Sequence, residues 1–164
     1  AYRAWSELGK PAEPQREQIR LLREKENLEP VGPVEEIEVA DSLSIPVELP
    51  MHAVSLLQLI PVKRKPPEPP SWEKGERELD CHGDLQVFLK WTPSAEEDFL
   101  HYRLLRRDAQ TAEESVICDS LCFNTSLYVD TEVRAGNTYR YRLQAVNASG
   151  RSSGYSEELV VSVS

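Results

Sequence analysis

The sequence predicts a mainly β protein: a small β-sandwich preceded by two short helices and by a β-hairpin from an incomplete β-sandwich. Two observations support this fold class. Beyond residue 79, short runs of alternating apolar and polar residues recur every 8–20 residues with turn signals between them, a pattern typical of all-β sandwiches. Eleven of the 12 prolines lie before residue 71, so the two halves of this 164-residue chain must fold differently.

Composition excludes several classes of protein. The 19 basic and 28 acidic residues give a net charge of −9, whereas a nucleic-acid-binding domain needs a basic surface to displace counterions from phosphates. Hydrophobic residues make up 40% and charged residues 29%, which is typical of a globular chain. Apolar runs are far shorter than the roughly 18 residues that span a bilayer. We therefore expect no nucleic-acid and no membrane partner, and with no signal peptide visible the localisation stays unknown.

Two short helices are expected at the start of the chain. Residues 1–8 read as the last turns of a helix that Gly9 terminates. Residues 15–26 predict a second helix, on which Ile19 and Leu22 form a narrow apolar stripe. Such a thin stripe buries little surface, so these helices cannot close a core alone.

The predicted hairpin follows these helices. Residues 43–49 alternate apolar and polar positions, as a half-buried strand does, and the chain turns at His52. Residues 53–60 carry apolar side chains on both faces, and a strand of that kind needs cover on both sides. Nothing else in residues 1–62 supplies this cover, because an isolated hairpin is marginal in water. The packing argument therefore predicts that residues 1–62 are the edge of a larger domain.

Three segments are expected from these patterns. Residues 1–62 are the edge of an incomplete β-sandwich with two short helices, the proline-rich residues 63–71 are a stiff linker, and residues 72–164 are a complete sandwich. The predicted core of that sandwich consists of inward positions on alternating strands: Leu85, Val87, Leu89, Trp91, Tyr102, Leu104, Tyr139, Tyr141, Leu143 and Val161.

The motifs of residues 72–164 are those of a known family. Leu-Lys-Trp91-Thr-Pro, Tyr102-Arg-Leu and Gly-Asn-Thr-Tyr139-Arg-Tyr resemble a fibronectin type III domain, an immunoglobulin-like β-sandwich. The resemblance implies that Trp91 is the core tryptophan. It also implies that Tyr139 forms a tyrosine corner, with its hydroxyl bonded to the backbone upstream. No Arg-Gly-Asp tripeptide is present, so adhesion through that motif has no support.

The N-terminal half carries a second resemblance. Trp5-Ser-Glu-Leu-Gly-Lys-Pro11, the run from Arg16 to Arg23 and the run from Leu49 to Leu59 are similar to the end of a family 39 glycoside hydrolase. That family includes β-xylosidases and α-L-iduronidases, in which a β-sandwich follows the catalytic (β/α)8 barrel. The resemblance implies a non-catalytic C-terminal region of a retaining exo-glycosidase, with the missing barrel as its partner. The alternative is a stand-alone fibronectin type III-like module that binds carbohydrate or another protein.

No catalytic site is expected in this chain. A retaining glycosidase needs two carboxyl groups about 5–5.5 Å apart, and in the resembling family the acid/base follows an asparagine. No Asn-Glu pair occurs here. The acidic runs Glu35-Glu36, Glu96-Glu97-Asp98 and Glu113-Glu114 are expected on solvated surface. Whether the chain belongs to an enzyme therefore depends on the parent that the resemblance implies.

Cysteine and histidine residues predict no metal site and no cofactor site. Cys118 and Cys122 could form a disulfide at their spacing, and Cys81 would then be a free thiol. His82 stands beside Cys81, but no CxxC motif completes a zinc-binding set. His52 is interpreted as a turn residue that packs against the missing sandwich, rather than as a contact to the barrel or to sugar.

Carbohydrate binding by this chain is the weaker expectation. Rings that do not point clearly inward could stack on pyranose faces, and these are Trp5, Trp72, Phe88, Tyr128 and Tyr155. Scattered single aromatic residues are, however, normal on a protein surface. Asn124 and Asn147 each begin an Asn-x-Ser/Thr glycosylation pattern, which matters only in a eukaryotic secretory setting.

Overall fold

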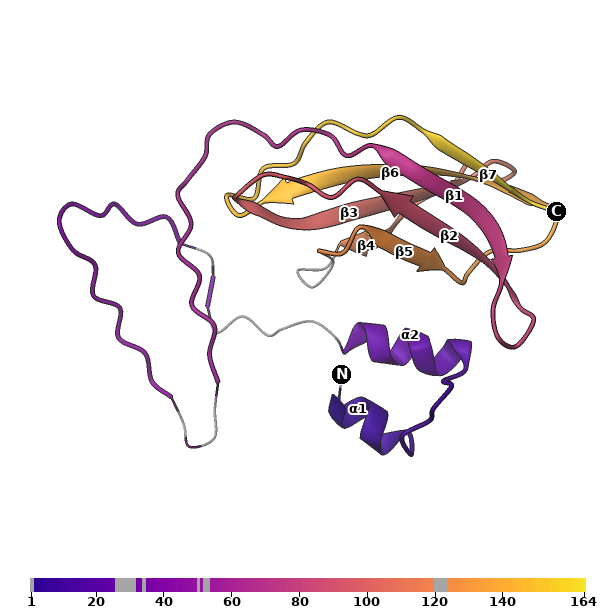
Figure 1. The fold of residues 1–164 in the computed structure, drawn as a ribbon, viewed down its shortest axis with the longest axis horizontal. Coiled ribbons are helices and arrows are strands. Elements are labelled where there is room, and N and C mark those ends of the chain that lie inside the picture. The colour runs from indigo at the N-terminus through magenta and orange to yellow at the C-terminus, as the bar shows by residue number, and fades with distance from the viewer. Residues whose placement is uncertain (1, 26–31, 34, 50, 52–53, 120–123) are drawn as a thin grey trace.

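The computed structural model describes residues 2–25, 32–33, 35–49, 51, 54–119 and 124–164. Within these residues, seven strands form two layers, and two short helices lie beside them (Figure 1). The helices are α1 (Tyr2–Glu7) and α2 (Arg16–Glu24), and the strands are β1 (Trp72–Leu79), β2 (Leu85–Trp91), β3 (Phe99–Asp108), β4 (Glu114–Asp119), β5 (Leu127–Asp130), β6 (Asn137–Asn147) and β7 (Leu159–Val163). None of the helices in the described ranges is long and apolar enough to cross a membrane.

The two layers are antiparallel sheets with the strand orders β1-β2-β5 and β4-β3-β6-β7. The longest pairing joins β3 to β6, from Phe99 opposite Asn147 to Asp108 opposite Tyr139. Because side chains alternate across each strand, one face of each sheet points into the space between the layers. This arrangement confirms the β-sandwich predicted for the C-terminal part.

The core lies where the sequence predicts it. Nine of the ten predicted core side chains are buried, and Leu85 is partly buried against them. The ring of Trp91 sits edge-on to Tyr102 with ring centroids 5.2 Å apart, and Trp72 packs on its other side at 5.7 Å. Full burial of each large side chain contributes on the order of 1.5–3 kcal/mol, so this cluster dominates the stability of the sandwich.

The tyrosine corner is present. The backbone N–H of Arg134 donates a hydrogen bond of 3.1 Å to the hydroxyl oxygen of Tyr139, five residues further on. The side-chain amide of Asn137 also donates to this oxygen, at 3.4 Å. Gly136, between them, has φ of +84°, a conformation that glycine adopts without strain. The hydroxyl of Tyr139 thereby closes the turn into β6, as the resemblance implied.

A buried carboxylate joins the two sheets. Asp130 at the end of β5 is 3% exposed and accepts hydrogen bonds from Arg106 of β3 and from the hydroxyl of Tyr141 of β6, each at 2.9 Å. The backbone N–H of Glu132 adds a third at 3.0 Å. Burial, followed by the charge of Asp130, raises the pKa of Tyr141, which therefore remains a donor. The buried negative charge of Asp130 is therefore compensated by an arginine and by two further hydrogen bonds.

The two helices agree with the prediction, with ends shifted by a few residues. Gly9 terminates α1 with φ of +82°. Gln15 caps α2, and its backbone N–H donates to the side-chain oxygen of Gln18 at 2.9 Å. Neither helix contains a fully buried residue, which agrees with their thin apolar stripe.

Two strands of the sandwich, β1 and β4, are absent from the sequence-based prediction. Both are edge strands, β1 beside β2 and β4 beside β3. Their side chains are mostly exposed or half-exposed, so they show little of the apolar alternation that marks a strand. In β4, for example, Val116 points to solvent while Glu114 pairs with Arg142.

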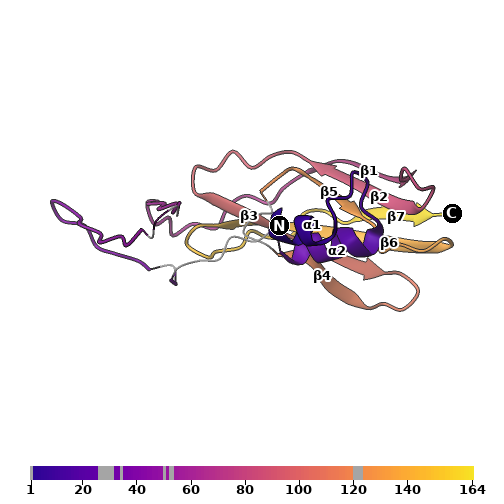
Figure 2. The ribbon, with the colours of Figure 1, turned by 90° about the horizontal axis from the view of Figure 1, so that it is seen from below.

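The predicted hairpin is wrong for the described residues. Residues 43–49 and 54–60 have no strand pairing, and both views show this part of the chain reaching away from the sandwich (Figure 1, Figure 2). A strand exists only where its N–H and C=O groups find a ladder partner, and the described residues offer none here.

Replacing Tyr139 by phenylalanine should lower the free energy of unfolding by about 1–3 kcal/mol, because the backbone N–H of Arg134 loses the buried Tyr139 side chain as its acceptor. Urea denaturation followed by tryptophan fluorescence measures this change. Tyr155→Phe is the matched control, since the ring of Tyr155 is 46% exposed and stacks against Arg142. An unchanged denaturation midpoint in Tyr139→Phe would mean that this hydroxyl does not stabilise the corner.

Candidate functional site

The most unusual surface of the molecule is an exposed apolar segment, defined here as residues 35–62. Three of its side chains illustrate the exposure: Val54 is 97% exposed, Met51 87% and Leu56 81%. The large apolar side chains exposed in this segment are Ile37, Val39, Val47, Leu49, Met51, Val54, Leu56, Leu57, Leu59 and Val62. Single exposed apolar residues are ordinary, but so many within 28 positions make this segment a candidate binding surface.

Helix α2 precedes this segment and is held on the sandwich through arginines. Arg23 donates to the backbone carbonyl of Val129 at 3.1 Å and to the hydroxyl of Tyr128 at 3.3 Å. Its guanidinium also lies over the Tyr128 ring, 4.9 Å from the centroid. Arg16, two turns earlier on the helix, donates to the carbonyl of Thr131 at 2.7 Å.

These contacts cover the open edge of the β1-β2-β5 sheet. Ser126 directs its carbonyl to β2, where Trp91 donates to it at 3.0 Å. Along a strand, the carbonyls of successive residues point to its two edges in turn. The carbonyls of Val129 and Thr131 lie an odd number of residues after that of Ser126, so they face away from β2 and toward α2. An uncovered edge strand can pair with other chains, and here the two arginines donate hydrogen bonds to its free carbonyl groups.

The linker is fixed to the sandwich as well. Pro67 and Pro70 are buried, and Lys63 lies 3.5 Å from the carboxylate of Asp98. Asp98 is 3% exposed and accepts a hydrogen bond of 3.1 Å from the side chain of Asn147. The exposed apolar segment therefore begins after one anchor on the sandwich and ends at another.

Two of the three acidic runs of the sequence lie on solvated surface. Glu35 and Glu36 are exposed, as are Glu113 and Glu114, in agreement with the prediction of solvated surface. Asp98 departs from that prediction because it is buried, where the sequence indicates solvent. The reason is its pairing with Asn147 and Lys63, which compensates the cost of removing a carboxylate from water.

The hydrogen bond between Asn147 and Asp98 also concerns one of the two glycosylation patterns, the one that begins at Asn147. The side-chain nitrogen of Asn147, to which a glycan would attach, is a buried donor to Asp98. Asn147 is therefore a structural residue in the folded sandwich. Asn124 is exposed and keeps the surface position that an acceptor requires.

The candidate sugar-stacking rings are each occupied by neighbours. Trp5 packs on Tyr2 with centroids 5.7 Å apart, and Trp72 packs on the core tryptophan. The other three lie under cations: Phe88 under Lys74, Tyr128 under Arg23 and Tyr155 under Arg142. A stacking platform needs free ring faces, and these five rings do not supply one together.

His52 and Cys122 lie outside the described residues, so their predicted roles stay predictions. His101 is buried in β3, with its Nε2 atom 2.9 Å from a carboxylate oxygen of Asp119 in β4. This pairing joins two neighbouring strands. Cys118 is half-buried in β4.

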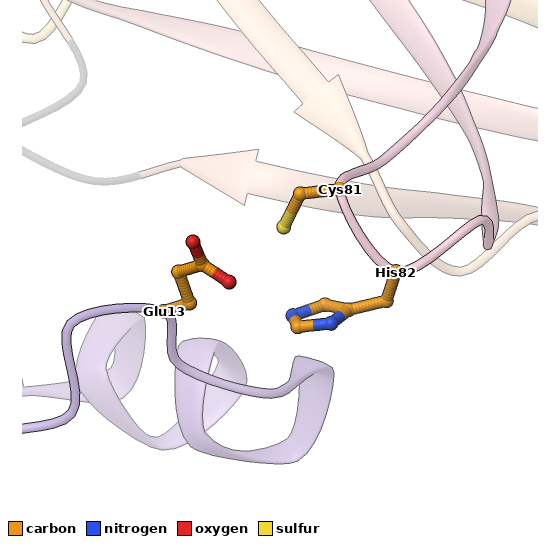
Figure 3. A group of neighbouring side chains, drawn as sticks. All are labelled: Glu13, Cys81 and His82. Atoms are coloured by element: carbon orange, nitrogen blue, oxygen red, sulfur yellow. The ribbon is translucent and has the colours of Figure 1, made fainter.

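His82 and Cys81 acquire a neighbour that their sequence positions conceal. They lie in the turn between β1 and β2, and Glu13 of the α1–α2 loop faces them (Figure 3). One potential ligand atom of each side chain lies within 4.8 Å of the other two, and all three residues are exposed. Sequence reasoning found the pair but missed Glu13, since no local spacing links residues 68 positions apart.

A rigid turn presents Cys81 and His82. The carboxylate of Asp80 accepts hydrogen bonds from the backbone N–H groups of His82 and Asp84, at 2.9 and 2.8 Å. The bond from Asp84, then that from His82 and the charge of Arg16, hold the pKa of Asp80 below its usual range. The turn therefore keeps an ionised carboxylate at its base at neutral pH.

Several solved structures are similar to part of this chain. No protein-family model matches the chain, and no curated protein matches it. Among solved structures, an Fn3-like protein from Clostridium thermocellum is 23% identical over 59% of this chain and 93% of its own, with a TM-score of 0.46. The twitchin kinase region from C. elegans is 25% identical over 60% of this chain and 17% of its own, also with a TM-score of 0.46.

A third structure is a β-1,2-glucanase from Parabacteroides distasonis, 19% identical over 61% of this chain and 14% of its own, with a TM-score of 0.44. In each case the similarity spans about three fifths of this chain. The strand order, the buried Trp91 and the Tyr139 corner give residues 72–164 a fibronectin type III-like fold.

Arg16→Ala and Arg23→Ala should each loosen α2 and raise the hydrogen-exchange rates of its amides by roughly tenfold, because an isolated helix of this length is unstable and each arginine makes charge-assisted hydrogen bonds. Exchange measured by mass spectrometry reports this directly. Arg20→Ala is the matched control, since Arg20 pairs only with Glu17 of the same helix in the described contacts. Equal exchange in all three variants would show that the arginines do not hold the helix.

Proposed function

We propose that this chain is a non-catalytic, structural region of a retaining exo-glycosidase of the family 39 type. A fibronectin type III-like sandwich serves many functions, so the fold alone does not select this one. The observation that carries the proposal is the exposed apolar segment, whose leucine and valine side chains need a second surface. In the parent enzyme, the remainder of the accessory sandwich and the (β/α)8 barrel would provide that surface.

The distribution of apolar side chains supports a large intramolecular partner. Leu56 and Leu57 are neighbours in the chain and both are exposed, so in an extended backbone they point to opposite sides. A strand with two apolar faces fits between two layers of a protein interior. A surface that binds free carbohydrate would instead present one apolar face with polar groups beside it.

The attachment of the segment supports a bracing role for the sandwich. The segment ends at Lys63, which reaches Asp98, and the chain then continues through the buried Pro67 and Pro70 into β1. Because this connection is packed rather than free, the sandwich would be held at a fixed position against whatever the segment packs on. Catalysis in the parent would rest with glutamates outside this chain.

The isolated chain should not hydrolyse aryl β-xylosides or aryl α-L-iduronides, because the acid/base that follows an asparagine in the resembling family has no counterpart in this sequence. Release of the aryl alcohol, measured on the purified chain, tests this. Turnover that persists through purification and disappears on substitution of one glutamate of this chain would contradict the assignment.

In the parent enzyme, Leu56→Asp and Leu59→Asp should each remove about 1.5–3 kcal/mol of burial energy and add a carboxylate to an apolar interface. We therefore expect a lower melting temperature and less active protein. Val160→Asp is the matched control, since Val160 is 49% exposed on β7 of the sandwich. Translation of the transcript upstream of Ala1 identifies the parent that this test requires.

Hydrogen exchange separates this proposal from the alternative of a stand-alone binding module. The amides of Leu56 and Leu59 should exchange fast in the 164-residue chain and slowly in the parent, while Leu143 of β6 is protected in both. If Leu56→Asp and Leu59→Asp leave the parent unchanged, or if no barrel precedes Ala1, the structural role is wrong. Binding of the chain alone to a polysaccharide would then support the alternative.

A further inference from the structure

We propose that Glu13, Cys81 and His82 bind a zinc ion that fastens the α1–α2 loop to the β1–β2 turn of the sandwich. This inference rests on the geometry of Figure 3 and is independent of the proposed glycosidase role. The three side chains come from two segments that are far apart in the sequence. A shared ion would therefore connect the N-terminal helices to the sandwich.

The donor set is suited to zinc. Thiolate, imidazole and carboxylate are the three protein ligands that zinc takes, and three of them leave a fourth position for water. Bond lengths of about 2.0–2.3 Å place ligand atoms about 3.3–3.7 Å apart in a tetrahedral site. The atoms here lie within 4.8 Å of one another, and because all three side chains are exposed they can close this gap by rotation about their own bonds.

Both segments are held in position by contacts that the metal does not provide. The Asp80 carboxylate fixes the turn that carries Cys81 and His82. On the other side, Arg16 follows Glu13 by three residues, and its Nε atom lies 3.4 Å from Asp84 and 3.5 Å from Asp80. Arg16 also donates to the carbonyl of Leu85, at the other end of the turn. The loop is thus docked next to the two ligands before an ion binds.

Local charge favours a dication at this position. A thiolate from Cys81 and a carboxylate from Glu13 balance the two charges of zinc, with His82 neutral. The nearby guanidinium of Arg16 is itself matched by Asp80 and Asp84. Because the ligands must lose protons, affinity for zinc should fall as the pH is lowered.

Zinc binding should also tighten the docking of α2. An ion that binds only the docked state reduces the population of the detached helix by a factor of 1 + [Zn]/Kd, about 100-fold when free zinc is at 100 times Kd. The hydrogen-exchange rates of the α2 amides should fall by up to that factor. The β6 amides that exchange only when the whole sandwich unfolds should slow by no more than the same factor, because that unfolding also releases the ion.

The experiment titrates Co²⁺ and Zn²⁺ into the chain carrying Cys118→Ser and Cys122→Ser, which leaves Cys81 as its single thiol. We expect one equivalent of Co²⁺ with a thiolate-to-metal charge-transfer band, displaced by Zn²⁺. In this background Cys81→Ser should abolish the band. Glu13→Gln and His82→Gln should each weaken binding at least tenfold, while the control Glu17→Gln on exposed α2 surface should not.

Exchange of α2 with and without Zn²⁺ provides the second readout, and near-ultraviolet circular dichroism verifies that each variant keeps its sandwich. Absence of a charge-transfer band, or one that survives Cys81→Ser, would overturn the site. If the Glu13→Gln variant binds zinc as tightly as the chain with Glu13, and zinc still slows the exchange of its α2 amides, then Glu13 is not a ligand. That outcome would overturn the connection between the two segments.

Discussion

The carboxylate of Asp130 is the interaction on which the arrangement of this molecule depends. It lies at the end of β5, a strand of four residues that pairs with β2 alone in its sheet. Its oxygens accept hydrogen bonds from Arg106 and Tyr141 of the opposite sheet, so a short edge strand is fixed across the core as well as along its ladder. The neighbouring carbonyls of Val129 and Thr131 lie at the free edge of the same strand, where the arginines of α2 donate to them.

The two halves of the chain are stabilised by different physics. The sandwich closes one apolar core around Trp91, whereas α2 contributes no fully buried side chain and is attached by hydrogen bonds to main-chain carbonyls. Contacts of the second kind, at a partly solvated surface, are worth little individually and do not organise the chain that follows. The described residues of the exposed apolar segment accordingly have neither a strand ladder nor a core.

The core could be predicted from the sequence wherever a strand alternates regularly between apolar and polar residues. Nine core positions, from Val87 to Val161, were predictable because each strand has one apolar face. Sequence reasoning failed for β1 and β4, because these two strands contain no fully buried side chain and so lose that signal. It also failed for Asp98 and for the cluster of Glu13 with Cys81 and His82, because their partners are distant in the sequence and only the folded chain brings them together.

The exposed apolar segment is therefore a long loop whose two ends are both attached to the sandwich. Arg23 fixes the chain before it, and Lys63 fixes the chain after it. Closing a loop of this length costs conformational entropy. Because both ends are already attached to the sandwich, this entropy is lost on folding, before any partner binds. A partner surface then has to order only the segment itself, which lowers the free-energy cost of burying its leucine and valine side chains. In this way the arginines of α2 would contribute to the packing of Leu56 and Leu59 without touching either residue.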